Sequence, residues 1–408
     1  MKLVEQTIIQ QDNELYPILD NLCFLSKNLY NASLYTIRQY YFANHKFYDA
    51  YKVINEFTQT NNVDYRALPA KVSQQTILLV GQNFNGFFGS IQAGIKTARI
   101  PKYLEKDGRQ VVTYSKQAVG TRYLKKEQCY TLSGVKNENG KIIKFKTKVD
   151  NIQFVRIIPK GNHIVIEVGY EKQEKSIELN NHIAAIDLGV NNLATVTTNI
   201  NAPFIISGKP LKYINHEYNK RIEEIQKCNY YCNNITKKWT KSMYKEVDKR
   251  NNRIKDFLHK ASRSIVNYLV SNNITTLVIG KNNGWKQNTK LGRRNNQNFV
   301  QIPFNQFIFM LQYKCNLVGI NVIVINESYT SKCSFIDNEE MIHHDVYCGK
   351  RKTRDLFITK QNLCINADVN GSYNIMRKFQ ETPINKYCVC YNPKKITIDL
   401  NSKNFIKL

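Results

Sequence analysis

The chain has 408 residues, with 59 Lys and Arg against 32 Asp and Glu and a formal net charge of +27. This length predicts two or three domains, and the basic excess predicts a polyanionic partner, with nucleic acid as the leading candidate. The apolar runs are too short to span a bilayer and the first residues lack the apolar core of a secretory signal, so we expect an intracellular protein with no membrane partner.

The N-terminal region begins with a predicted strand at residues 1–10 and continues as a helical module. Apolar side chains recur at helical spacing from Leu22 to Tyr41. Pro69 then introduces a second helix, because proline is favoured in the first turn. Residues 11–98 are therefore predicted to form a helical domain.

From Ile100 the residue pattern changes to short runs that favour β-strands. Turn signals separate these runs at 107–108, 139–140 and 160–162. Together with the first strand, this region predicts a small β-barrel or sandwich.

The second half of the chain alternates strands and helices, which predicts an α/β domain. The segment HIAAIDLGVNNLATVTTN, residues 182–199, predicts two strands joined by a glycine turn and places Asp187 near the middle of a sheet. Residues 209–270 are rich in Lys and Arg and predict two long basic helices. The remaining predicted elements are strands at 275–280 and 320–326, a helix at 303–318 and a short helix after Asp368.

Three acidic residues stand where strands or helices meet loops, namely Asp187, Glu327 and Asp368. Hydrolysis of nucleic acid by two metal ions needs such a set, because carboxylates at strand ends hold two Mg²⁺ ions about 4 Å apart. A carboxylate after a strand is also common as a turn former or helix cap, so none of the three predicts catalysis alone. Their joint occurrence with the basic excess favours a metal-dependent nuclease.

Several segments together resemble a known family. AAIDLGVNNLATV, the basic hairpin with DFLHK, GWKQ, ESYTSKCS and INADVNGSYNI resemble the RuvC-type nuclease core of TnpB, the transposon-encoded RNA-guided DNA nuclease. LSKNLYNASLYTIRQYY, LPAKVSQQ and IPKYLEKDGRQVVTYSKQA resemble that family's recognition helices and wedge-like β-barrel. The resemblance covers nearly the whole chain and extends to type V CRISPR effectors and eukaryotic Fanzors.

This resemblance implies a multidomain α/β fold with an RNase H-like RuvC nuclease core, a small wedge β-barrel and an inserted helical recognition domain. The implied parts are the wedge-like barrel at 1–10 and 99–180, the recognition domain at 11–98, the nuclease core at 181–330 with its basic helical insertion at 209–270, a target-nucleic-acid-binding insertion at 331–364 resembling a degenerate zinc finger, the last nuclease segment at 365–380 and a C-terminal tail at 381–408.

The resemblance also implies a function. It implies a monomer that binds a guide (omega-type) RNA and two Mg²⁺ ions and cleaves double-stranded target DNA beside a short motif, in the cytoplasm of a prokaryotic cell. Sequence choice would then lie with base pairing by the guide. A transposase performing strand transfer is disfavoured, because the chain shows no HUH-type His pair with a catalytic Tyr.

The middle carboxylate departs from the family pattern. Most TnpB proteins end the strand equivalent to TTLVIG with glutamate, where this chain has Gly280. Some TnpB proteins and Fanzors supply a glutamate from a later segment, and Glu327 lies where that residue is expected. The resemblance thus implies Asp187, Glu327 and Asp368 as catalytic Mg²⁺ ligands. The alternative is that Glu327 only caps a turn, in a nuclease-inactive RNA-guided DNA-binding protein that acts like a repressor.

The cysteines also depart from the family pattern. Ten cysteines scattered over a long intracellular chain predict reduced thiols rather than disulfides. Family members often carry two CxxC pairs before the last aspartate, which bind zinc, but here Cys333 is followed three positions later by Ile336. Buried free thiols are one interpretation. The other is a zinc site built from Cys333, His343 or His344, Cys348 and Cys364.

Candidate nucleic-acid contacts come from the basic residues and from the resemblance. A solvated charged face is the alternative for each basic residue, and packing is the alternative for each aromatic residue. Residues expected to track phosphates are Lys102, Arg109, Arg122, Arg250, Arg253 and Arg263. Residues of the recognition helices expected to contact bases or the flanking motif are Tyr30, Asn31, Lys71 and Gln75.

Overall fold

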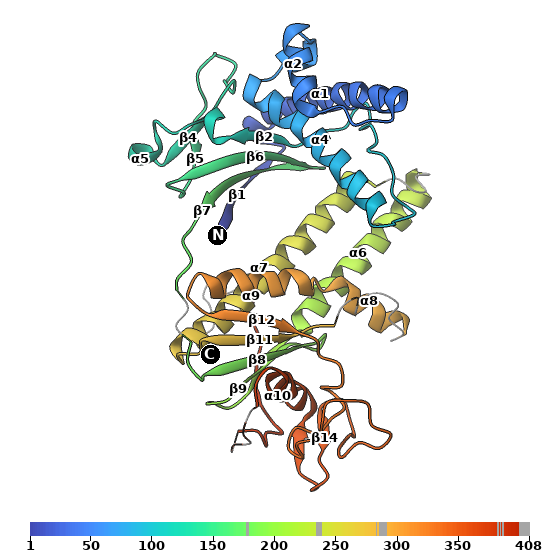
Figure 1. Ribbon diagram of the computed structural model, residues 1–408, viewed down its shortest axis with the longest axis vertical. Coiled ribbons are helices and arrows are strands. Elements are labelled where there is room, and N and C mark those ends of the chain that lie inside the picture. The colour runs from blue at the N-terminus through green and yellow to red at the C-terminus, as the bar shows by residue number, and fades with distance from the viewer. Residues whose placement is uncertain are drawn as a thin grey trace. The chain divides into compact units, whose positions relative to one another are not determined.

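A computed structural model describes residues 1–176, 179–233, 239–282, 284, 292–381, 383, 385 and 387–399 (Figure 1). The chain divides into two compact units, Met1–Lys172 and Gln173–Leu408. Apart from Gly284, the predicted motif GWKQ lies outside the described residues, as do several residues of the predicted tail.

The first unit has helices between residues 15 and 92, where the sequence predicts helices. They are α1 (Leu15–Asn44), α2 (Ala50–Gln59), α3 (Val63–Arg66) and α4 (Ala70–Gln92). Helix α1 buries Leu22, Leu29 and other apolar residues at helical spacing. Pro69 is the N-cap of α4, one residue before the first helical position at which proline is favoured.

The strands of the first unit form two small antiparallel sheets beside these helices. The larger sheet has the order β1-β7-β6-β2 and consists of β1 (Lys2–Gln10), β7 (His163–Glu171), β6 (Ile152–Lys160) and β2 (Val112–Ser115). The smaller sheet consists of β3 (Val119–Gly120), β4 (Cys129–Leu132) and β5 (Phe145–Lys146), with the short helices η1 (Lys116–Ala118) and α5 (Leu124–Glu127) nearby in the chain. In the described residues β1 and β2 are edges of the larger sheet, so the predicted wedge-like barrel is not confirmed.

The second unit is built on a six-stranded mixed sheet with the order β12-β11-β8-β9-β10-β16. Its strands are β12 (Asn321–Ile325), β11 (Thr276–Gly280), β8 (Ile183–Leu188), β9 (Asn192–Thr198), β10 (Phe204–Ser207) and β16 (Lys394–Ile396). Strands β8, β11 and β12 are parallel, so their carboxyl ends meet at one edge of the sheet. The predicted hairpin is the antiparallel pair β8 and β9, and β8 is an inner strand as expected.

Helices cover both faces of this sheet (Figure 1). The helices of the second unit are α6 (Lys209–Asn233), α7 (Lys241–Ser271), α8 (Arg293–Gln301), α9 (Phe304–Asn316) and α10 (Ala367–Phe379). Ile186 of β8 packs in the core that contains α7 and α9, whereas its neighbour Ala185 packs in the core that contains α10. Alternate strand residues point to opposite faces, which explains why β8 is a continuous apolar run.

Between β12 and α10 runs a long connection that has little regular structure and contains the predicted insertion at 331–364. It ends in an antiparallel sheet of β13 (Lys350–Arg351), β14 (Leu356–Ile358) and β15 (Cys364–Asn366), which leads directly into α10. Phe335 stacks on Tyr373 of α10, with ring centroids 5.0 Å apart. The insertion is therefore packed against the helix that carries Asp368.

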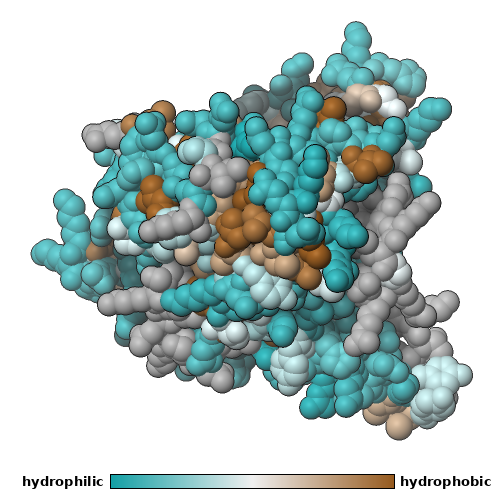
Figure 2. Space-filling view, turned by 90° about the horizontal axis from the view of Figure 1, so that it is seen from below, coloured by the Kyte–Doolittle hydropathy of each residue, from teal (hydrophilic) through white to brown (hydrophobic). Residues whose placement is uncertain are grey.

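Among the described residues no helix has the length and apolarity needed to cross a bilayer. On the face in Figure 2, apolar side chains form small patches within a mainly hydrophilic surface.

Candidate active site

Two of the three predicted carboxylates line one cavity of about 240 Å³ in the second unit. Asp187 stands near the carboxyl end of β8, and Asp368 stands in the first turn of α10. We call this cavity the carboxylate pocket. Its other lining residues are Leu188, Gly189, Val190, Asn191, Asn192, Thr195, Ser331, Arg351 and Arg354.

Local hydrogen bonds fix Asp368. The side chain of Asn366 caps α10 by accepting the backbone N–H groups of Asp368 at 3.1 Å and Val369 at 3.2 Å. The two carboxylate oxygens of Asp368 accept from Asn192 Nδ2 at 2.6 Å and from the Arg351 guanidinium at 2.9 Å. The sequence analysis missed both Asn192 and Arg351. Asn192 had a signal, because it follows Asp187 in the same hairpin, whereas Arg351 had none.

The electrostatics of Asp187 tie the three carboxylates together. Burial, and then the negative charges of Asp368 and Glu327, raise the pKa of Asp187 well above its ordinary value. The positive charge of Arg351 and a hydrogen bond from the Leu188 backbone act in the opposite direction. The negative charges of these carboxylates therefore repel one another, and a bound cation would reduce this repulsion.

A glycine brings α10 close to Asp187. A Cβ atom placed on Gly371 would lie 3.0 Å from Asp187 Oδ2. Any larger residue at this position would press on the carboxylate, so Gly371 permits the approach of the helix that also carries Asp368.

Glu327 follows β12 and is held by Asn282, which follows β11. Asn282 Nδ2 donates to Glu327 Oε1 at 3.3 Å, and the Glu327 backbone N–H donates to Asn282 Oδ1 at 3.2 Å. The other carboxylate oxygen, Oε2, is buried and has no hydrogen-bond partner among the described residues. Burial raises the pKa of Glu327 to about 7, and the nearby charge of Lys378 opposes this shift.

The Glu327 carboxylate lies directly over Gly280. A Cβ atom on Gly280 would stand 2.9 Å from Glu327 Oε2 and would overlap the side chain of Ile375. In the parallel register Gly280 pairs with Ile325, two residues before Glu327. The carboxylate of Glu327 therefore takes the space in which a side chain at position 280 would begin.

The turn after β12 is closed by other groups. Thr330 donates both its backbone N–H and its hydroxyl to the backbone carbonyl oxygen of Glu327, at 3.2 and 2.8 Å. The Ser328 N–H is accepted by the side chain of Asn326 at 2.8 Å. These contacts leave the Glu327 carboxylate pointing at Gly280, so capping the turn does not explain its presence.

The donor set of the site suits Mg²⁺, which prefers carboxylate and other oxygen ligands. The orphaned, buried Oε2 of Glu327 is the observation that favours a cation most directly. Within the described residues, no three His, Cys, Asp or Glu side chains already converge as a finished metal site. The carboxylates therefore fit the ion in chemistry and in shared charge.

The predicted zinc ligands do not fit a zinc ion. Cys333 is buried, and its thiol donates to the backbone oxygens of Glu340 at 3.4 Å and Ile342 at 3.8 Å. Cys348 and Cys364 are exposed. Among described residues no group of His343, His344 and the cysteines comes together, because the thiol of Cys333 is turned toward main-chain oxygens instead.

Several predicted nucleic-acid contacts have structural partners. Tyr30 is only 4% exposed and its hydroxyl accepts from Asn83 at 2.9 Å, so of the two alternatives for this aromatic residue the structure shows packing. The side-chain amide of Asn31 both donates to and accepts from the backbone of Leu104, at 3.0 and 2.9 Å. It therefore ties α1 to the loop between α4 and β2, and a contact of Asn31 with nucleic acid stays a prediction.

The other predicted nucleic-acid contacts fall into two groups, side chains that have protein partners and side chains that are exposed or half-buried. Arg109 pairs with Asp20 through two hydrogen bonds, Arg253 pairs with Glu217 at 2.6 Å, and Arg250 donates to Asn215 and to the backbone of Gln301. The predicted contacts with exposed side chains are Lys71, Lys102 and Arg122, while Gln75 and Arg263 are half-buried.

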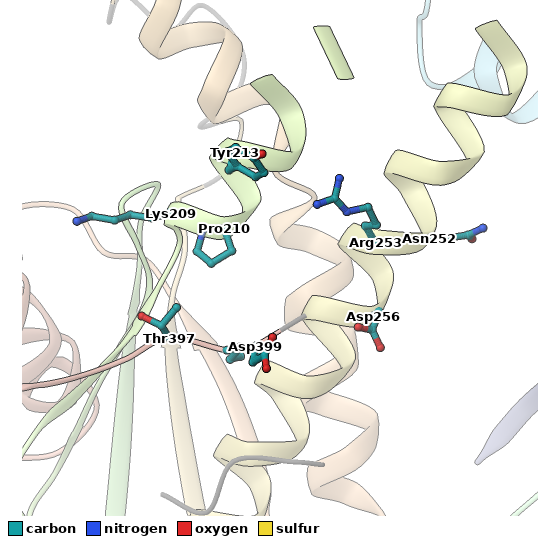
Figure 3. Close-up of a pocket in the computed structure, with 9 residues that line it drawn as sticks. Lys209, Pro210, Tyr213, Asn252, Arg253, Asp256, Thr397 and Asp399 are labelled. Atoms are coloured by element: carbon teal, nitrogen blue, oxygen red, sulfur yellow. The ribbon is translucent and has the colours of Figure 1, made fainter. Parts of the chain in front are cut away.

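Arg253 also lines a larger cavity of about 940 Å³, which lies between α6, α7 and the segment after β16 (Figure 3). Lys209 and Tyr213 contribute from α6, and Asp256 from α7. This cavity shares no lining residue with the carboxylate pocket and mixes basic and acidic side chains.

Comparisons with known proteins place both halves of the site in matched regions. The family model OrfB_IS605, described as a probable transposase, matches residues 163–286, and the model described as Cas12f1-like, TNB domain, matches residues 304–375. The first region contains Asp187 and Gly280, and the second contains Glu327 and Asp368.

Two curated proteins are similar in sequence. The TnpB-like protein ORF457 of Acidianus two-tailed virus is 25% identical over 244 residues, which cover 55% of this chain and 51% of that protein. The TnpB-like protein MJ0751 of Methanocaldococcus jannaschii is 24% identical over 242 residues, which cover 57% of this chain and 81% of that protein. The chain thus spans about half the length of the viral relative.

A solved structure is similar in fold. The chain superposes with a TM-score of 0.56 and 14% identity on a chain of the cryo-EM structure of the Cas12f1-sgRNA-target DNA complex. The match covers 89% of this chain and 82% of that chain. At this identity the likeness concerns the fold alone.

Proposed function

Since the chain belongs to the TnpB family, we propose that it is an RNA-guided, Mg²⁺-dependent DNA endonuclease that cleaves target DNA beside a short flanking motif. The observation that carries this proposal is the Glu327 carboxylate lying over Gly280. It supplies a third carboxylate, whose negative charge contributes to raising the pKa of Asp187, in a chain whose β11 ends without one.

In this proposal Asp187, Glu327 and Asp368 hold the metal. Two Mg²⁺ ions bound there would activate the attacking water and stabilise the leaving oxygen. Asn192 and Arg351 orient Asp368, and Asn282 orients Glu327, through the hydrogen bonds described above. Such outer contacts fix the direction in which a ligand's lone pairs point.

The charges of the pocket support phosphodiester chemistry. Arg351 and Arg354 line the carboxylate pocket and bring positive charge beside the acidic residues. Arginine is well suited to bind phosphate, because its planar guanidinium presents several donors at once. A phosphate bound in the pocket would therefore have cationic donors beside the carboxylates.

We also propose the partners and the division of labour along the chain. A guide RNA and double-stranded target DNA are the expected partners of a monomer, supported by the net charge of +27 and by the fold shared with a protein solved with sgRNA and target DNA. Residues 11–98 would act as the recognition domain, 1–10 and 99–180 as the wedge, and 331–364 as the target-binding insertion. Exposed Lys71, Lys102 and Arg122 are the proposed backbone contacts.

A second candidate function is guided binding without cleavage. The glycine at position 280 favours it, as does the lack, among described residues, of three converged metal-binding side chains. The two candidates differ in one measurable step, the cutting of a bound target.

The test uses the protein purified with the RNA of its own locus and a plasmid library of targets with randomised flanks. We expect cleavage that depends on Mg²⁺ and on the guide, and we expect Glu327→Ala to abolish cleavage while guide and target binding persist. Glu340→Ala, which removes an exposed carboxylate from the adjoining insertion, is the matched control and should cut normally. Guided binding without any cutting by the unaltered protein would establish the second function instead. Cutting that survives Glu327→Ala would show that the third ligand lies elsewhere.

A further inference from the structure

The insertion at residues 331–364 has three cysteines, and neither Cys333 nor Cys348 has a second cysteine at CxxC spacing after it. Cys333 is followed three positions later by Ile336, and Cys348 is followed three positions later by Arg351. Ile336 is 7% exposed and belongs to the apolar core beside α10. Arg351 forms an ion pair with Asp368. The two positions at which a second cysteine would complete a CxxC pair are thus occupied by side chains that make other contacts.

The remaining thiols are poorly placed to bind zinc, which needs thiolates that face one point. Burial, and then the charge of Glu339, raise the pKa of Cys333, so its neutral thiol is favoured. Its sulfur donates to main-chain oxygens, as described above. Cys364 lies in β15 and pairs with Ile358 of β14, on an exposed edge of the small sheet.

A buried carboxylate joins the two segments that carry Cys333 and Cys348. Glu339 is 6% exposed. One carboxylate oxygen accepts the backbone N–H of Ser334 at 2.7 Å, and the other accepts the backbone N–H of Cys348 at 2.7 Å. Hydrogen bonds of this length to an ionised acceptor are among the strong ones in proteins.

Each of the joined segments is tied to the carboxylate pocket. On one side, the backbone of Cys333 and Phe335 is held by Asn370 of α10, with contacts of 2.8 and 2.9 Å. On the other side, the chain runs from Cys348 into β13, where Arg351 reaches Asp368. Glu339 therefore sets the strand that bears Arg351 against the helix that bears Asp368.

We propose that the insertion is a metal-free finger in which the Glu339 carboxylate joins the two segments that a zinc ion joins in the four-cysteine pattern. Glu339 is then a positioning residue, which acts on the carboxylate pocket through Arg351. This inference does not rest on the proposed nuclease activity, and its tests do not measure cleavage.

The first test measures the metal directly. The full chain, expressed with its RNA in zinc-supplemented medium, is analysed for zinc by mass spectrometry and for thermal unfolding with and without 1,10-phenanthroline. We expect far less than one zinc per chain, a melting temperature that the chelator does not change, and the same melting temperature for Cys348→Ser and Cys364→Ser. One zinc per chain whose removal lowers the melting temperature would overturn the proposal.

The second test measures the hydrogen bonds that Glu339 accepts from the Ser334 and Cys348 amides, by comparing Glu339→Gln with Glu340→Gln. Glu340 is the exposed neighbour, so the control makes the same change of charge one residue away. Glu339→Gln should speed hydrogen exchange at the Ser334 and Cys348 amides at least about tenfold, because it weakens a charged hydrogen bond to each. It should also speed labelling of Arg351 by phenylglyoxal. Equal exchange and equal labelling in the two variants would refute the role of Glu339. If Glu339→Gln does not fold, the zinc content and the cysteine variants still decide the question.

Discussion

Replacing Gly280 with alanine adds one methyl group where the Glu327 carboxylate now lies. The new Cβ would stand 2.9 Å from Glu327 Oε2 and would overlap Ile375 of α10, so one or both side chains must move. Overpacking of this kind costs about 1–3 kcal/mol. A displacement of a catalytic group by a fraction of an ångström to 1 Å reduces the rate by up to about 100-fold. We therefore expect a lower melting temperature, by several degrees, and a roughly 10- to 100-fold slower cleavage.

The two effects can be separated with a second change. Ile375→Val removes the Cδ1 atom that the new methyl group would overlap, so Gly280→Ala with Ile375→Val should regain stability while cleavage stays slow. Gly86→Ala is the control, because Gly86 lies in α4 with open space around it and alanine is favoured in helices by about 0.5–1 kcal/mol. The assays are thermal unfolding of the protein and single-turnover cleavage of a guided target. Full stability with full cleavage in Gly280→Ala would refute the packing of Glu327 over Gly280.

Three further predictions concern other parts of the chain. Asn192→Ala should slow cleavage about 10- to 100-fold and weaken Mg²⁺ binding in calorimetry, because Asp368 loses an orienting hydrogen bond, whereas unchanged Mg²⁺ affinity would contradict that role. Burial, and then the charge of Arg263, lower the pKa of Lys314 from 10.5 to about 7, so unfolding takes up a proton between these pH values and the stability of the unaltered protein should rise with pH from about 7 to 10.5. In urea unfolding at several pH values, Lys314→Met should lose this rise in stability. An identical rise in the variant would count against the pKa shift. Lys102→Ala and Arg122→Ala should each weaken RNA binding and reduce its salt dependence by about one phosphate contact, because both side chains are exposed. Arg253→Ala should change RNA binding less, because its guanidinium is paired with Glu217. The reverse order would show that side-chain exposure does not identify the residues that contact RNA.

Local pattern was sufficient for the elements that position the site. The apolar run that ends at Asp187, the strands before Gly280 and Glu327, and the helix after Asp368 all have periodicity or length that specifies their type, and β8, β11, β12 and α10 confirm them. Elements with weaker patterns were missed. Strand β16 is only three residues long and is recognised as a strand only through its pairing with β10.

The sequence by itself determined the basic charge, the α/β order of the second unit and the candidacy of three carboxylates, because these depend on composition and on neighbours along the chain. Only the tertiary structure decided which polar groups are already in use. Tyr30 is buried and Arg109 is paired with Asp20, whereas the sequence left packing or a nucleic-acid contact open for Tyr30, and a solvated face or a phosphate contact open for Arg109. Conversely, Arg351 donates a hydrogen bond to Asp368, which lies 17 residues later in the chain. The carboxylate of Glu327, which follows the neighbouring strand, lies over Gly280. Contacts of this kind depend on the distance between side chains in space, which the order of residues alone does not contain.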